Sequence, residues 1–92
     1  MNETDWKKVE LVKDSFDKLH DFKLDDVERR IISGTTFQHK LWYKKHEIVL
    51  TEIIERGLTK EAVLEFEGKT YSFKHVFEAE KEAVKLFKEK DK

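Results

Sequence analysis

The sequence contains no cysteine and no proline, and it has only three glycines among its 92 residues. Without cysteine, disulfides, thiolate catalysis and thiolate metal binding are all excluded. Three glycines as far apart as Gly34, Gly57 and Gly68 cannot make a glycine-rich phosphate loop. No apolar run approaches the roughly 18 residues of a membrane span, and the N-terminus lacks the apolar stretch of a signal peptide. We therefore expect a cytoplasmic chain that forms a single domain over residues 1–92.

Charge of neither sign dominates, because 19 basic side chains stand against 20 acidic ones, for a net charge of −1. The whole chain therefore has no general attraction for nucleic acids or anionic membranes. Along the sequence, however, the charge is segregated. Residues 35–46 carry three basic and no acidic groups, whereas residues 47–68 carry two basic and six acidic groups.

Apolar periodicity predicts two helices near the ends of the chain. In residues 5–21 the apolar positions recur at steps of three and four, and they are Trp6, Val9, Val12, Phe16 and Leu19. Residues 75–90 show a similar stripe, made of Val76, Phe77, Ala83, Val84 and Phe87. Between these, residues 25–33 are expected to form a short helix that begins with Asp25 and Glu28 as a capping pair and ends at Gly34.

The segment 36–56 has two interpretations. A capping-box pattern at residues 35–38 and the glycine at position 57 bracket a helix of about twenty residues. Its many β-branched residues favour two strands instead, at about 37–43 and 47–54. The helix is preferred because its start and stop signals agree. Its apolar side chains would then fall on three arcs, which is wider than a domain of this size can cover and predicts a second copy against it.

Residues 63–74, VLEFEGKTYSFK, predict a β-hairpin. With Gly68 and Lys69 in a type II′ turn, Phe66 lies opposite Tyr71 and Leu64 lies opposite Phe73. All four of these side chains then share one face. The predicted fold class is α+β, a mostly helical domain in the order helix, helix, helix, β-hairpin, helix.

Catalytic chemistry has no candidate in this sequence. The histidines are isolated, and a helix would place His39 and His46 about 10 Å apart along its axis, too far to share one ion. The serines lack the sequence context of an activated nucleophile. We expect no enzymatic activity, no metal and no cofactor.

A binding role is the remaining option, and the basic segment FQHKLWYKKH at residues 37–46 is its candidate site. The predicted element order resembles that of winged-helix DNA-binding domains, in which the third helix enters the major groove and the hairpin forms a wing. That resemblance implies nucleic-acid contacts from this helix and from the tip of the hairpin. The candidate contact residues, for nucleic acid or for a protein partner, are Gln38, His39, Lys40, Lys44, Lys45, His46 and Lys69.

The acidic block that follows the basic segment, and Glu65 and Glu67 beside Lys69, oppose phosphate binding. The leading prediction is therefore a non-enzymatic regulatory or adaptor protein that acts through protein–protein interaction and forms a homodimer. DNA binding is the alternative.

Overall fold

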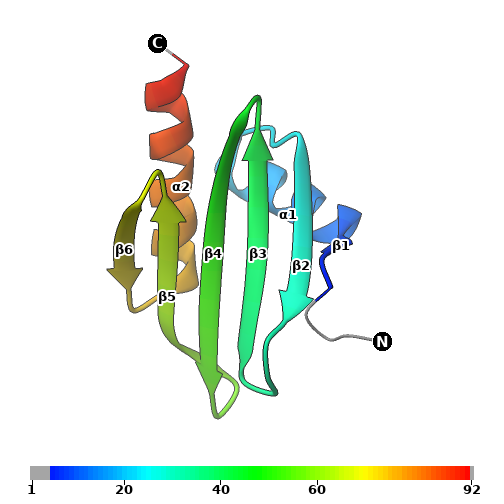
Figure 1. Ribbon diagram of the computed structural model, residues 1–92, viewed down its shortest axis with the longest axis vertical. Helices are drawn as coiled ribbons and strands as arrows, with labels where there is room; N and C mark the ends of the chain where they lie inside the picture. The colour runs from blue at the N-terminus through cyan, green and yellow to red at the C-terminus, as the bar shows by residue number, and fades with distance from the viewer. Residues whose placement is uncertain (1–4, 92) are drawn as a thin grey trace.

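The computed structural model describes residues 5–91, which form an antiparallel sheet with two helices packed against one of its faces (Figure 1). Six strands lie in the sheet in their order along the chain, so each pairs with the one before it. The elements are β1 (Lys7–Lys8), α1 (Glu10–His20), β2 (Asp26–Ile31), β3 (Thr36–Tyr43), β4 (His46–Glu55), β5 (Leu58–Phe66), β6 (Lys69–Phe73) and α2 (Val76–Lys90).

The predicted mostly helical order is wrong, because the second and third expected helices are strands. Residues 25–33 contribute β2, and residues 36–56 contribute β3 and β4, close to the two-strand alternative. Asp25 and Gly57, which were predicted to begin and to end helices, have other roles in the sheet. The carboxylate of Asp25 accepts a hydrogen bond from the backbone N–H of Lys44, and Gly57 occupies a hairpin turn at a φ of 80°. The β-branched residues of this segment pair across strands, which outweighs a helix cap worth about 1 kcal/mol.

The two terminal helices are present, with one changed boundary. Helix α2 spans Val76–Lys90, close to the expected 75–90, but α1 begins only at Glu10. The residues just before it are taken up by pairing with β2, with Lys7 opposite Arg29 and Lys8 opposite Glu28. The backbone N–H of Val9 then donates to the carbonyl of Val27 at 3.0 Å, which ties the start of α1 to the sheet.

The β5–β6 hairpin is present, but its register differs from the predicted one. The turn residues are Glu67 and Gly68, with φ of 51° and 80°, as in a type I′ turn. Leu64 therefore lies opposite Tyr71, and Phe73 lies opposite Ala62. The turn sits one residue earlier than predicted, which shifts each pair by two residues and leaves the predicted apolar residues on one face.

The core lies between the helices and the sheet face that they cover, which we call the helix face. Phe87 of α2 is fully buried, and its ring lies 5.5 Å from that of Tyr43 and 6.2 Å from that of Phe66. The other sheet face, which we call the open face, carries no helix and points toward the viewer in Figure 1. Within residues 5–91, no helix is long and apolar enough to cross a membrane.

Candidate functional site

Strand alternation divides the basic segment, because successive side chains of a strand point to opposite faces. The buried Leu41 fixes the helix face of β3, so His39 shares that face while Gln38 and Lys40 lie on the open face. Lys44 and Lys45 form the turn between β3 and β4, and His46 opens β4. The segment therefore does not form one basic surface.

On the open face, Lys40 is already engaged. Its Nζ lies 4.4 Å from the ring centroid of Trp6, and the Arg30 guanidinium carbon lies 4.5 Å from the same centroid. Lys40 Nζ also lies 3.8 Å from a carboxylate oxygen of Glu47 on the neighbouring strand. Cation–π and ionic contacts thus hold the lysine against the sheet.

The Gln38 side chain is held in the same network. Arg30 Nε donates to Gln38 Oε1 at 2.7 Å, and Gln38 Nε2 donates to Thr51 Oγ1 at 3.0 Å. These bonds use one donor and the acceptor of the amide, and they run across β2, β3 and β4. The arrangement supports the sheet and leaves little of the amide for a ligand.

At the β3–β4 turn, Lys44 forms an ion pair with Asp91 at the end of α2. Tyr43 also donates to this carboxylate, at 2.9 Å from Oδ2. Hydrogen bonds from Lys44 and then from Tyr43 lower the pKa of Asp91, and the bond to Asp91 raises the pKa of Lys44. This cluster anchors the C-terminal end of α2 to the turn.

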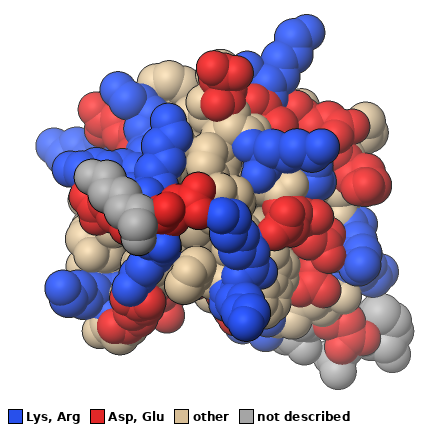
Figure 2. All heavy atoms as spheres, turned by 90° about the horizontal axis from the view of Figure 1, so that it is seen from above, with Lys and Arg blue, Asp and Glu red and all other residues tan. Residues whose placement is uncertain are grey.

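Figure 2 looks down on the end of the molecule where this turn and the end of α2 lie, and it shows acidic and basic side chains interspersed. Lys69 comes directly after the β5–β6 turn and lies opposite Phe66. In that turn, Glu67 pairs with Lys90 at 2.8 Å. The lysines are therefore distributed among carboxylates.

The winged-helix interpretation is wrong at the level of the fold. The helix that would enter a major groove is the pair of strands β3 and β4, which lie in the middle of the sheet. The β5–β6 hairpin is part of the same sheet and does not project from a helical bundle as a wing would (Figure 1). DNA binding in the manner of that family therefore has no structural counterpart here.

Two histidines of the basic segment pack on the helix face. His39 lies between Arg29 of β2 and Leu50 of β4 in the strand register. Burial, with a smaller contribution from the Arg29 charge, lowers the pKa of His39 to about 4. The ring of His46 lies 6.5 Å from that of Phe66. Both imidazoles are therefore parts of the packing beneath the helices.

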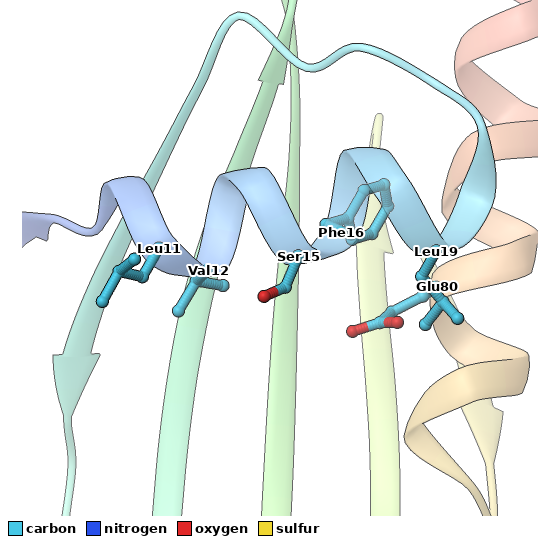
Figure 3. Close-up of a pocket in the computed structure, with 6 residues that line it drawn as sticks. All are labelled: Leu11, Val12, Ser15, Phe16, Leu19 and Glu80. Carbon is cyan, nitrogen blue, oxygen red and sulfur yellow. The ribbon is translucent and has the colours of Figure 1, made fainter.

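A groove beside α1 is the surface that sequence reasoning missed. Figure 3 shows Leu11, Val12, Ser15 and Leu19 projecting from one side of α1 over the strands. Phe16 and, from α2, Glu80 complete the lining, and the groove has a volume of about 280 Å³. Its rim is apolar and accessible, since Leu11 is 82% exposed and Leu19 is 60% exposed. We call this the α1 groove.

One end of the α1 groove is built by contacts between the two helices. His20 Nε2 lies 2.8 Å from Glu80 Oε1, and the imidazole is stacked on the ring of Phe77 at 5.2 Å. Phe77 is itself 45% exposed. Leu19 and Phe77, which belong to the predicted apolar stripes of the two helices, thus remain at the surface.

A signal for this groove was present in the sequence. Leu11 and Leu19 are eight residues apart with Ser15 midway, so they lie along one line of a helix. Leu11 lies outside the predicted apolar stripe, of which Phe16 is buried in the core and Val9 and Val12 pack against it. No periodicity rule states which apolar line a helix leaves uncovered.

Within residues 5–91, no three histidine or acidic side chains gather in a group that could hold a metal ion.

Comparison with known proteins identifies no relative. No protein-family model, no curated protein and no solved structure matches the chain.

Proposed function

We propose that this protein is a non-enzymatic binding module that holds an apolar segment of a protein partner in the α1 groove. One observation carries the proposal: Leu11 and Leu19 stay 82% and 60% exposed on the same line of α1. Exposed leucines are common singly, but two of them bordering a groove lined by Val12 and Phe16 form a continuous apolar surface. Full burial of each leucine in a complex contributes about 1.5–3 kcal/mol.

The occupant that fits this surface is an amphipathic helix. Leu11, Ser15 and Leu19 follow one another at intervals of four residues and span about 12 Å along α1. The small Ser15 between the two leucines allows a partner helix to approach closely, so that its apolar side chains pack on either side.

The charged residues around the groove predict which charges the partner helix carries. Glu80 lines the groove from α2, and Glu10 and Asp14 are exposed on α1, whereas Lys18 is the exposed basic residue of the same helix. A partner helix with lysine or arginine beside its apolar stripe would complement the mostly acidic residues that surround this apolar groove.

Selection from a display library of amphipathic helices, followed by NMR titration of the labelled protein, tests the proposal. We expect selected helices to carry basic residues beside the apolar stripe and to shift the amide resonances of α1. The double variant Leu11→Ser/Leu19→Ser should lose this binding while remaining folded, since both side chains are exposed.

Leu58→Ser is the matched control, because Leu58 is 74% exposed at the start of β5, outside the groove. It should leave binding unchanged. Helices that shift only the open face, or whose binding survives the double variant, would refute the assignment of the groove.

A further inference from the structure

The sheet ends at β6, whose outer edge pairs with no strand in the described part of the chain. Beside this edge lies a second groove, between Phe73 of β6 and the outer side of α2, with a volume of about 500 Å³. Edge strands present unpaired backbone groups that pair readily with another extended chain. The question is what chain would fit this edge.

The strand register identifies the free backbone groups. In the two-residue β5–β6 turn, Phe66 and Lys69 form the closing hydrogen-bonded pair, and hydrogen-bonded and non-hydrogen-bonded pairs then alternate. Lys69, Tyr71 and Phe73 therefore direct their N–H and C=O groups toward β5. Thr70 and Ser72 direct theirs outward, to the free edge.

The outer side of α2 carries a charge sequence that is complementary to itself. Glu78, Lys81, Glu82 and Lys85 line the groove beside β6, spaced so that they share one side of the helix. When this helix is placed antiparallel to a copy of itself, each acidic residue faces a basic one: Glu78 faces Lys85, and Lys81 faces Glu82. None of the four makes an ion pair within residues 5–91, although Lys81 Nζ lies 5.7 Å from the ring of Phe77.

We propose that the occupant of this edge is a second copy of the chain, paired through β6 in an antiparallel arrangement about a two-fold axis at Tyr71. Thr70 of each copy pairs with Ser72 of the other, which gives four backbone hydrogen bonds. Both α2 helices then run antiparallel on the same side of a continuous sheet. Glu78 of one copy faces Lys85 of the other, and Lys81 faces Glu82.

The centre of the strand pairing and the centre of the charge pattern on α2 lie at the same height along the molecule. From Phe73 to Tyr71 the strand advances about 7 Å, at 3.3–3.4 Å per residue. Helix α2 begins next to the same end of β6, at Val76, and advances as far in about four to five residues at 1.5 Å each. Tyr71 therefore lies level with about residues 80–81, close to the midpoint between Lys81 and Glu82.

This interface is separate from the α1 groove. Glu80, which lines that groove, and the residues that line the β6 groove lie on different sides of α2. A dimer formed through β6 would leave both α1 grooves accessible, so the two proposals fail or succeed independently.

Sedimentation velocity from low to high micromolar concentration tests the interface. We expect a species of twice the 11.1 kDa chain mass. Glu78→Lys places lysine against Lys85 of the other copy at two symmetric contacts and should weaken the dimer on the order of tenfold or more. Lys85→Glu should do the same. Mixing the two variants should restore a dimer, because each supplies the charge that the other lacks.

A backbone variant isolates the strand pairing. Ser72→Pro removes an outward N–H and leaves the β5 bonds in place, since proline is tolerated on an edge strand. It should give a monomer, whereas Ser72→Ala, which keeps the N–H, should stay dimeric. Glu55→Lys, the same charge change at the exposed end of β4, should also stay dimeric.

A wild-type monomer at every concentration would overturn this proposal, and so would a dimer unaffected by Glu78→Lys and Ser72→Pro. Binding of helical peptides to the monomeric Glu78→Lys variant would still support the α1 groove. Conversely, a dimer that survives Leu11→Ser/Leu19→Ser without binding peptides would support only the β6 interface.

Discussion

The imidazole Nε2 of His20, in the last turn of α1, lies 2.8 Å from the carboxylate Oε1 of Glu80 in α2. The His20 side chain is only 4% exposed and lies between the rings of Phe16 and Phe77, at 4.6 and 5.2 Å. This polar contact and the stacking of His20 on Phe77 join the two helices. It also fixes one end of the α1 groove.

Replacing Glu80 with alanine should destabilise the protein by about 1–3 kcal/mol, because the buried imidazole loses its partner. Alanine favours helix, so the measured loss understates the contact. Glu80→Gln keeps an acceptor oxygen and should lose clearly less. Urea unfolding followed by circular dichroism measures both. No loss in Glu80→Ala would mean that the hydrogen bond contributes nothing to stability.

Phe87 is the side chain on which the core depends most. It is fully buried and its ring packs near those of Phe22, Tyr43 and Phe66. Phe87→Ala should cost about 3–5 kcal/mol, a large share of the 5–15 kcal/mol that stabilises a typical domain. Phe77→Ala, at a position 45% exposed on the same helix, should cost about 1 kcal/mol or less. Similar losses at both positions in urea unfolding would contradict the burial pattern.

The sequence predicted the terminal parts of the fold better than its middle. The β5–β6 hairpin and α2 depend on local signals, a glycine turn and an apolar stripe, which short stretches of sequence contain. In β4, Ile48 and Leu50 are buried on the helix face, while Val49 and Ile53 are half-buried on the open face. With both faces partly covered, the strand lacks clean alternation, and its apolar residues spread over three arcs of a helical projection.

The candidate site was misjudged for a related reason. A stretch such as Gln38-His39-Lys40 is contiguous in sequence, but a strand sends its side chains to two faces. Lys40 is held by Trp6, which precedes β1, and by Glu47, which lies in β4. No local sequence pattern around Lys40 predicts these two contacts. The groove residues Leu11 and Leu19 show the converse, since only the assembled fold shows which apolar line stays uncovered.

The β4–β5 turn contains a strained residue that can be improved. Arg56 and Gly57 occupy it with φ of 55° and 80°, as a type I′ turn requires. Arginine disfavours this left-handed conformation, whereas asparagine tolerates it. Arg56→Asn should therefore stabilise the protein by about 0.5–1 kcal/mol, visible as a higher midpoint of thermal unfolding.

Gly57→Ala is the opposite test at the next position. A Cβ there would meet no atom within 4 Å, so any loss comes from backbone strain alone. We expect destabilisation of about 1 kcal/mol or more. An unchanged or higher unfolding midpoint would show that this turn is not type I′ in solution.

His39 should make stability depend on pH between about 4 and 6.5. Burial and the charge of Arg29 lower its pKa from 6.5 to about 4 in the folded protein, so the unfolded chain takes up the proton first. Above pH 6.5 the imidazole is neutral in both states and contributes no pH dependence. As the pH falls from 6.5, unfolding becomes more favourable, and the effect levels off below pH 4 at up to about 3 kcal/mol.

Urea unfolding of wild type and His39→Gln at a series of pH values measures this contribution. Carboxylates also titrate at the low end of the range, so the informative quantity is the difference between the two proteins at each pH. We expect the variant to lose less stability than wild type between pH 7 and 4. His75→Gln, at an exposed position, should follow the wild-type curve. Parallel curves for wild type and His39→Gln would place the His39 imidazole in water rather than beneath the helices.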